Sequence, residues 1–270
     1  MIKLNAIILA AGQGIRLQPL TNDKPKGMVQ LFGKSLLEWQ INTLTNCGIK
    51  DITIVTGYMS EQINFKNILY KNNPNFQTTN MVETLFCAKE KLLDSTIISY
   101  GDIIYQKDVL QKLIDSPYEI SVIIDKNWES YWDCRFSNPL SDAESLKIND
   151  SKNIIEIGKK TNSLNEICGQ YIGLMKFQGE GTKNLKFFYE NMAKKATSQK
   201  NPLNPNCKFE ESYMTDLLQG MIDSGIEIKG IEIKNGWLEL DSFSDYLLYE
   251  KMEKENTLKR FLDVKKLIMK

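Results

Sequence analysis

The stretch that decides the fold lies near the N-terminus, where residues 6–14 read Ala-Ile-Ile-Leu-Ala-Ala-Gly-Gln-Gly. The unbroken apolar run predicts a β-strand buried on both faces, as in a parallel sheet that is covered by helices. The glycines that follow allow backbone amides to approach phosphate oxygens, and the loop after such a strand is where α/β sheets bind ligands. These residues therefore predict an α/β fold with an anion-binding loop.

Helical and strand patterns alternate along the rest of the chain, which predicts a Rossmann-like fold of three layers with a mixed, mostly parallel sheet. Ser35 is the predicted cap of the first helix, which ends at Cys47-Gly48, and Ser242 is the predicted cap of the last, which runs towards Lys270. Between these two helices we expect strands at 51–56, 96–100, 119–124, 170–177, 226–233 and 237–240, and helices at 80–93, 106–114, from 178 through 192, and at 211–223.

The pattern weakens between residues 127 and 169, where two tryptophans, an Asn-Pro pair and short strand-like pieces occur. We interpret residues 1–270 as a single domain, with 127–169 as an inserted β-rich lobe and 242–270 as a C-terminal helical segment.

The composition excludes several classes of function. The 34 basic and 34 acidic side chains cancel, so we expect neither a nucleic acid nor a membrane as partner. Histidine is absent, which removes Ser-His-Asp and Cys-His catalysis and histidine-bound zinc. The five cysteines are scattered without a Cys-x-x-Cys motif, and no apolar run is long enough for a signal peptide or a membrane span. A cytoplasmic protein with reduced thiols is expected.

The glycine loop continues into a basic segment. Residues 9–21 read LAAGQGIRLQPLT and are followed by Lys24-Pro25-Lys26. This is not a dinucleotide fingerprint, because the third glycine is missing, and not a P-loop, because no Gly-Lys-Ser/Thr follows. The segment closely resembles the first motif of the sugar-nucleotidyltransferase-like superfamily, LAAGxGxRLxPLT followed by PK.

This resemblance implies a nucleotide site. Gly12 and Gly14 would hold the base and phosphates, Arg16 would contact the departing pyrophosphate, and Lys26 would contact the α-phosphate and the incoming substrate, which makes Arg16 and Lys26 the candidate catalytic residues. The nucleotide-binding residues that it implies are Leu9, Ala10, Ala11, Gly12, Gly14, Asn80, Met81, Thr84 and Gly101.

Two aspartates extend the resemblance to the rest of the chain. Asp102 follows the strand at 96–100 and Gly101, and Asp241 follows the segment Trp-Leu-Glu-Leu at 237–240. The resemblance implies that both bind a metal ion, and two carboxylates suit Mg²⁺ that bridges nucleotide phosphate oxygens. Without the family, an aspartate at either position is more often a helix cap or a strand-end residue.

Residues 79–85 and 128–144 are similar to cytidylyltransferases that act on phosphocholine, aminoethylphosphonate or phosphoglutamine. The lobe offers basic groups for a phosphate, acidic groups for an ammonium and indole faces for cation–π contact. Alternatively, the two tryptophans pack one helical face, and the basic groups lie in a solvated turn. The expected acceptor-binding residues are Trp128, Trp132, Arg135, Lys159, Gln170 and Tyr171.

We therefore expect a Mg²⁺-dependent cytidylyltransferase, in which an ionised acceptor oxygen attacks the α-phosphorus of CTP and pyrophosphate leaves. No general base is needed, which agrees with the lack of histidine. Two alternatives stay open at this point: a sugar-1-phosphate nucleotidyltransferase that uses UTP or dTTP, and a non-catalytic regulatory subunit that binds metabolites. The sequence also leaves a homodimer open.

Overall fold

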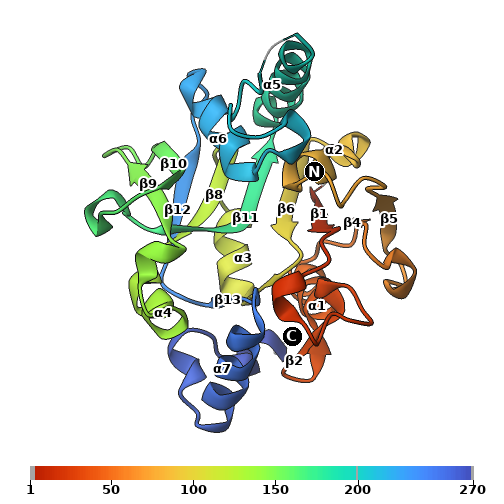
Figure 1. Cartoon of the computed structure of the whole chain (residues 1–270), viewed down its shortest axis with the longest axis vertical. Coiled ribbons are helices and arrows are strands. Elements are labelled where there is room, and N and C mark those ends of the chain that lie inside the picture. The colour runs from red at the N-terminus through yellow and green to blue at the C-terminus, as the bar shows by residue number, and fades with distance from the viewer. Residues whose placement is uncertain (1–3, 199, 269–270) are drawn as a thin grey trace.

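A seven-stranded sheet forms the centre of the protein, which we describe from a computed structural model for residues 4–198 and 200–268. In chain order its strands are β1 (Leu4–Ala10), β4 (Ile52–Thr56), β5 (Leu69–Asn72), β6 (Ser95–Tyr100), β8 (Ile120–Asp125), β11 (Gln170–Gln178) and β12 (Lys229–Ile233). They are arranged in the order β12-β8-β11-β6-β1-β4-β5 (Figure 1). Only β11 runs antiparallel to its neighbours, so the predicted mixed, mostly parallel sheet is confirmed.

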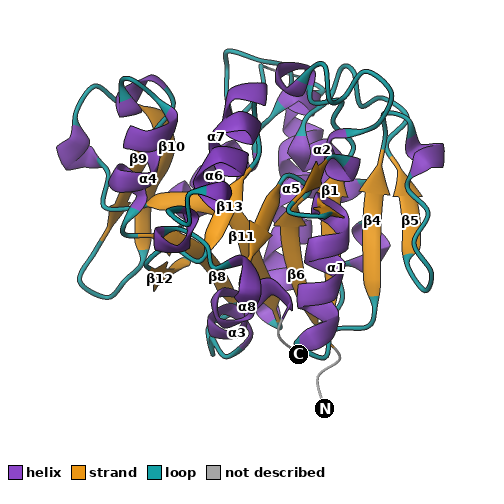
Figure 2. Ribbon diagram, turned by 90° about the horizontal axis from the view of Figure 1, so that it is seen from below, coloured by secondary structure: helices purple, strands orange, loops and turns teal. Residues whose placement is uncertain are grey.

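Helices cover both faces of this sheet (Figure 2). In β1, Ala6 and Ile8 belong to one apolar cluster, whereas Ile7 and Leu9 belong to the other. The first cluster includes residues of α1 (Leu36–Asn46) and α3 (Lys107–Ile114), and the second includes residues of α2 (Met81–Phe86), α5 (Glu180–Ala196) and α6 (Met214–Asp223). Because both faces of β1 are buried, its sequence has no polar alternation.

Helix α1 begins and ends as expected. The Ser35 hydroxyl accepts a hydrogen bond from the amide of Glu38 at 3.1 Å, and the helix ends before Gly48, whose φ of 85° is left-handed. The expected helix over 80–93 is wrong in its length, since α2 ends at Phe86 and a 3₁₀ turn follows at Lys89–Lys91. Ala88 and Leu92 are both buried and four residues apart, which gives the sequence a helical spacing that the backbone does not follow.

Two further boundaries differ from the prediction. The helix expected from residue 211 begins at Met214, because Phe209–Glu211 form a 3₁₀ turn, and the strand expected from residue 226 begins at Lys229. Residues 127–169 contain α4 (Trp128–Arg135) and a two-stranded antiparallel sheet of β9 (Glu144–Ile148) and β10 (Ile154–Lys160).

The last predicted helix is also shorter than expected. Helix α7 (Phe243–Lys254) begins at Ser242, whose hydroxyl accepts from the amide of Asp245, but it does not run towards Lys270. Asn256 is left-handed, with φ at 57°, and this residue turns the chain so that Leu258 is buried. A separate helix, α8 (Val264–Ile268), follows, and Lys270 lies outside the described residues.

A small antiparallel sheet positions the candidate site. Strand β7 (Ile103–Tyr105) pairs with β13 (Trp237–Glu239), which lies near the other end of the sequence. Asp102 immediately precedes β7, and Asp241 lies two residues beyond β13. The pairing therefore brings the two aspartates to one edge of the main sheet.

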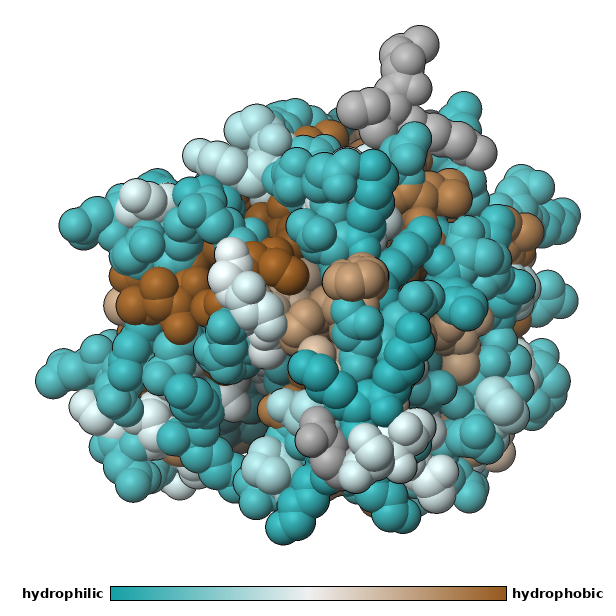
Figure 3. Space-filling view, turned by 90° about the horizontal axis from the view of Figure 1, so that it is seen from above, coloured by the Kyte–Doolittle hydropathy of each residue, from teal (hydrophilic) through white to brown (hydrophobic). Residues whose placement is uncertain are grey.

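The surface is mostly hydrophilic on the face shown in Figure 3, where apolar side chains emerge in limited patches. Within residues 4–198 and 200–268, no helix combines the length and apolar character that crossing a membrane requires.

Candidate active site

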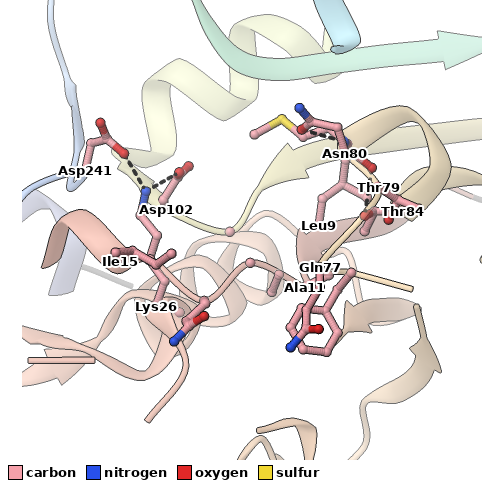
Figure 4. Close-up of a pocket in the computed structure, with 18 of the residues that line it drawn as sticks. Leu9, Ala11, Ile15, Lys26, Gln77, Thr79, Asn80, Thr84, Asp102 and Asp241 are labelled. Carbon is pink, nitrogen blue, oxygen red and sulfur yellow. Dashed lines mark hydrogen bonds and ion pairs between the residues drawn. The ribbon is translucent and has the colours of Figure 1, made fainter. Parts of the chain in front are cut away.

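A cavity of about 620 Å³ lies at the carboxyl ends of β1 and β6. Its wall is formed by the glycine loop, the basic segment, the start of α2 and both aspartates (Figure 4). The lining residues are Leu9, Ala10, Ala11, Gly12, Gln13, Gly14, Ile15, Arg16, Lys26, Gly27, Phe76, Gln77, Thr79, Asn80, Met81, Thr84, Gly101, Asp102, Tyr213 and Asp241. This is where ligands bind in open α/β sheets.

The glycine loop needs glycine at Gly14. Its φ is 74°, which an L side chain rarely adopts, and a Cβ there would lie 2.8 Å from the Cβ of Lys26. The hydroxyl of Thr21 donates to the carbonyl of Gly14 at 2.8 Å and so holds the loop in place. The loop is thus packed directly against the stem of Lys26.

Close approach also explains Gly101. Its amide donates to the carbonyl of Leu9 at 2.8 Å, and a Cβ on Gly101 would lie only 2.6 Å from that same oxygen. A larger residue would push β6 away from β1 at the point where both strands meet the cavity. Glycine therefore places Asp102 next to the loop.

Four charged groups meet in the cavity, and Figure 4 shows three of them: Lys26, Asp102 and Asp241. The Lys26 ammonium lies 2.8 Å from Asp102 Oδ2 and 2.8 Å from Asp241 Oδ1. A guanidinium nitrogen of Arg16 lies 2.6 Å from Asp241 Oδ2. The Arg16 side chain is 70% exposed, whereas the other three are 13–14% exposed. Two cations from one loop therefore neutralise two carboxylates from distant segments.

The protonation states follow from these contacts. Burial by itself lowers the pKa of Lys26, but Asp102 and Asp241 outweigh it and raise that pKa above its ordinary value. Burial by itself raises the pKa of Asp241, but Lys26 and Arg16 lower it below its ordinary value. An ammonium and a carboxylate therefore face each other at neutral pH.

The carboxylate pair fits a hard divalent cation. Oδ1 of Asp102 is buried and has no hydrogen-bond partner, so this oxygen is available to bind a cation. Among the described residues, no group of three or more His, Cys, Asp or Glu side chains comes together as a metal site. Two carboxylates alone suit Mg²⁺, which usually keeps several waters and takes substrate phosphates as its other ligands.

The opposite wall is held by a network around Asn73. This buried amide donates to the hydroxyls of Thr79 and Thr84 at 2.9 and 3.0 Å. The side-chain oxygen of Asn80 caps α2 by accepting from the main-chain amide of Met81. The main-chain amide of Asn80 donates to the carbonyl of Glu210. The segment that the resemblance assigns to the nucleotide is therefore fixed on both sides.

The nine residues expected to bind nucleotide all line this cavity, as do Arg16, Lys26, Asp102 and Asp241. The sequence analysis missed Gln13, Ile15, Gly27, Phe76, Gln77, Thr79 and Tyr213. Gln13, Ile15 and Gly27 adjoin the residues that were singled out, so proximity to the motif could have indicated them. Phe76, Gln77 and Tyr213 come from loops for which no sequence signal was recognised.

None of the six residues expected to bind the acceptor lines the cavity. Trp128 and Trp132 are each 4% exposed and pack edge to face with ring centroids 5.9 Å apart, which matches the alternative that they fill one helical face. The Arg135 side chain is 1% exposed and lies in ion pairs with Glu239 and Asp245. As the structure places it, the Arg135 guanidinium is enclosed and does not reach a ligand in the cavity.

The other three differ in their surroundings. Lys159 is 60% exposed and pairs with Glu156 at 3.0 Å, and Gln170 is bound through its amide to the main chain of Glu144. Tyr171 packs edge to face against Tyr100, with centroids 5.7 Å apart, and Tyr100 directly precedes Gly101. Tyr171 is thus joined to a cavity segment through a single intervening side chain.

This fold and cavity are those of the nucleotidyltransferases, and residues 6–134 match the MobA-like NTP transferase domain family. Within that class, the chain belongs to the cytidylyltransferases. It is 42% identical over 255 residues to CTP:phosphoglutamine cytidylyltransferase of Campylobacter jejuni, a match that covers 90% of this chain and 97% of that protein. It is 36% identical over 119 residues to choline-phosphate cytidylyltransferase of Streptococcus pneumoniae, covering 43% and 52% of the two chains.

Solved structures agree in fold. CTP:phosphocholine cytidylyltransferase from Streptococcus pneumoniae aligns with a TM-score of 0.69 at 21% identity, covering 94% of this chain and 100% of that one. The inositol-1-phosphate CTP transferase from T. maritima aligns with a TM-score of 0.70 at 19% identity, covering 94% and 97%. The expected Rossmann-like α/β class is confirmed.

Proposed function

We propose that this protein transfers CMP from CTP to a small phosphorylated acceptor of the phosphoglutamine type and releases pyrophosphate. The observation that carries the proposal is the meeting of Lys26, Asp102 and Asp241 beside the glycine loop. The similarity to phosphoglutamine cytidylyltransferase over nearly the whole chain supports this acceptor over phosphocholine and aminoethylphosphonate.

The reaction is a substitution at the α-phosphorus of CTP. An ionised oxygen of the acceptor phosphate forms the new bond to that phosphorus, and the bond to the bridging oxygen of the β-phosphate breaks. Pyrophosphate leaves with the electron pair of that bond. Because the attacking oxygen is already deprotonated at neutral pH, positioning and charge neutralisation supply the acceleration.

The glycine loop, Arg16 and Lys26 each have a role in this scheme. Main-chain amides of the glycine loop bind the phosphates, and the exposed Arg16 contacts the departing pyrophosphate. Lys26 stabilises the negative charge shared by the α-phosphate and the attacking oxygen. A lysine suits this task because its ammonium is a compact charge on a flexible stem.

Asp102 and Asp241 would hold Mg²⁺. When bound, this ion neutralises phosphate charge and stabilises the leaving group. Because Lys26 bridges these two carboxylates, its ammonium would have to leave them, towards the phosphates, for the ion to bind.

The acceptor enters beside Tyr171 in this proposal, because Tyr171 lies next to Tyr100 and the lobe flanks that side. All five cysteines are free thiols in the structure, which suits the cytoplasmic location that we propose. Two expectations stay predictions from the sequence: that the protein can form a homodimer, and that it binds neither nucleic acids nor membranes.

A pyrophosphate-release screen tests the function. Purified protein with Mg²⁺ is assayed with each of CTP, UTP, dTTP and ATP against phosphorylated amides, amines and sugars. The expected result is rapid release with CTP and an amide phosphate such as phosphoglutamine. Preferred use of UTP or dTTP with a sugar 1-phosphate would overturn the assignment, and no release with any pair would favour the regulatory subunit.

A matched pair of lysine variants controls for contaminating activity. Lys26→Met should remove pyrophosphate release, since it deletes the ammonium in the cavity. Lys24→Met changes a nearby lysine that does not line the cavity and pairs with Asp23 at 3.5 Å. Equal activity in the two variants would place the observed turnover in another protein.

A further inference from the structure

Arg135 belongs to helix α4 in the lobe, yet its guanidinium is committed to the C-terminal part of the chain. Nε and Nη2 donate to the two carboxylate oxygens of Asp245 at 2.9 and 3.1 Å, and Nη1 donates to Glu239 at 2.8 Å. Only three arginines occur in this chain, and this one forms a planar, bidentate pair that lysine cannot reproduce. The fork is therefore used to bind two carboxylates of this protein.

The same Asp245 carboxylate also binds the main chain of the active site. Its Oδ2 accepts from the amide of Asp241 at 3.2 Å and from the amide of Ser242 at 2.9 Å. Oδ2 thus takes one hydrogen bond from Arg135 and two from the backbone next to the metal-binding carboxylate. Arg135 and Asp241 are separated by a single side chain.

Arg135 also reaches this segment from the other direction. Glu239, its second partner, lies two residues before Asp241, and the hydroxyl of Tyr249 donates to the Glu239 carbonyl at 2.8 Å. The turn that carries Asp241 is therefore held on both sides, through residues 239 and 245. The contacts within residues 239–245 fix the direction in which the Asp241 side chain leaves the backbone.

Aromatic rings enclose the guanidinium. Its central carbon lies 5.3, 5.4 and 5.0 Å from the ring centroids of Tyr131, Trp132 and Phe136, all in or next to α4. A charge enclosed in this way is strongly destabilising when one partner is removed, so the pair holds α4 firmly against α7. A flexible surface ion pair would not transmit position in this manner.

We propose that Arg135 is a positioning residue for Asp241, acting through the carboxylate of Asp245 and supported by Glu239. This inference rests on the proposed role of Asp241 as a metal-binding carboxylate. It replaces the expected role of Arg135 in gripping the acceptor. The lobe then contributes to catalysis by fixing one of the two carboxylates.

Arg135→Lys tests this inference, because lysine keeps the positive charge but cannot span both oxygens of Asp245. We expect kcat to fall about tenfold or more, as for other small displacements of reacting groups, with the KM for CTP changed little. The Mg²⁺ concentration for half-maximal activity should rise. Mn²⁺ binding to the nucleotide-free enzyme, followed by electron paramagnetic resonance, should weaken by a similar factor.

Arg260→Lys is the matched control. Arg260 is exposed and touches the same helix through the sulfur of Cys134 at 2.9 Å, but it has no described contact with residues 239–245. It should leave kcat and Mn²⁺ affinity unchanged. Asp245→Asn should reproduce the Arg135→Lys defect, and the double variant should be no worse than either single one, because all three remove one link.

Three results would decide against the inference or separate it from the function itself. If Arg135→Lys lowers the melting temperature but leaves Mn²⁺ affinity and the Mg²⁺ dependence unchanged, the pair is merely structural. If it raises the KM for the acceptor alone, Arg135 acts on the acceptor after all. If Asp241→Asn itself retains full Mn²⁺ affinity, the metal assignment fails irrespective of Arg135. Should Arg135→Lys not fold, Asp245→Asn alone makes the same measurement.

Discussion

The main-chain amide of Leu240 donates a hydrogen bond to the carbonyl oxygen of Asp102, with 2.9 Å between the two atoms. Leu240 directly precedes Asp241, so a backbone hydrogen bond contributes to the spacing of the two acidic residues. The β7–β13 pairing continues this contact on the side away from the cavity. The carboxylate pair is therefore a rigid feature, whereas Lys26 arrives on a long, flexible stem.

Replacing either aspartate should abolish turnover without unfolding the protein. Asp102→Asn and Asp241→Asn each remove a carboxylate that we propose as a ligand of Mg²⁺, and we expect a loss of ~10²-fold or more in kcat at saturating Mg²⁺. Pyrophosphate release and circular dichroism measure the two properties. Asp150→Asn, in an exposed turn of the lobe, is the control. Activity within a few-fold of wild type would remove that aspartate from the metal site.

Removing the Lys26 ammonium should have opposite effects on metal affinity and on catalysis. The ammonium now occupies the space between Asp102 and Asp241, so Lys26→Met removes the Lys26 charge from both carboxylates and leaves Asp241 paired with Arg16. Without nucleotide, Mn²⁺ should bind the variant more tightly than wild type, although turnover is lost. Electron paramagnetic resonance of free Mn²⁺ measures this. Weaker Mn²⁺ binding in the variant would show that Lys26 and the ion do not compete.

Substitutions at two glycines with positive φ distinguish the effect of backbone strain from the effect of cavity shape. Gly14 and Gly33 have φ of 74° and 85°, but only at Gly14 would a Cβ collide with Lys26. Each substitution by alanine should cost about 1–2 kcal/mol of stability. Only Gly14→Ala should also lower kcat. Thermal melts and pyrophosphate release of both variants test this, and equal activity would count against the packing of the loop on Lys26.

The nucleotide choice can be measured by thermal stabilisation. CTP should raise the melting temperature more than UTP, dTTP, ATP or GTP at equal concentration, in the presence of Mg²⁺. A ligand at ~100 times its dissociation constant adds about 2.7 kcal/mol to stability. A dominant response to UTP or dTTP would move the protein to the sugar-phosphate enzymes.

A buried lysine far from the cavity gives the stability a pH dependence. Lys176 is 1% exposed and donates to the carbonyls of Ile114 and Ser116, and burial lowers its pKa to about 8. Between pH 8 and its ordinary pKa of 10.5, the unfolded chain binds more protons at this residue than the folded one. This group therefore adds stability as the pH rises through that window.

The comparison with Lys176→Met isolates this contribution from that of other lysines. We expect the melting temperature of wild type, relative to the variant, to increase from pH 8 to pH 10.5. The variant also loses two hydrogen bonds, which lowers its melting temperature by an amount that does not depend on pH. A constant difference across the window would show that Lys176 keeps its ordinary pKa when folded.

The nucleotide side of the site was predictable because it is local. Residues 4–26 contain the strand, the loop and both cations, and the physical demands on each are visible in sequence: apolar residues for a buried strand, glycine for close approach, basic groups for phosphate. Asp102 lies just after the buried strand β6, but its role as a metal ligand was implied by the resemblance. Asp241 depended on the resemblance, since the pairing of β7 with β13 joins distant segments.

The acceptor side was not predictable in the same way. Arg135, Trp128 and Trp132 have the chemistry of a binding site, but the same chemistry serves a buried ion pair with aromatic neighbours. Which use applies depends on Glu239 and Asp245, more than a hundred residues further on. No local pattern contains that information. The break in the last helix at Asn256 is similar, because it serves the burial of Leu258 against distant elements.

Lys26 and Asp241 are 215 residues apart along the chain, and this separation has a consequence during synthesis. All seven strands of the main sheet leave the ribosome before Asp241 does. A nascent chain can therefore form the glycine loop and present Lys26 while lacking the second acidic residue. A product cut short before position 241 would keep the phosphate-binding loop without the means to turn over its substrate. Catalytic activity thus reports that translation has passed position 241.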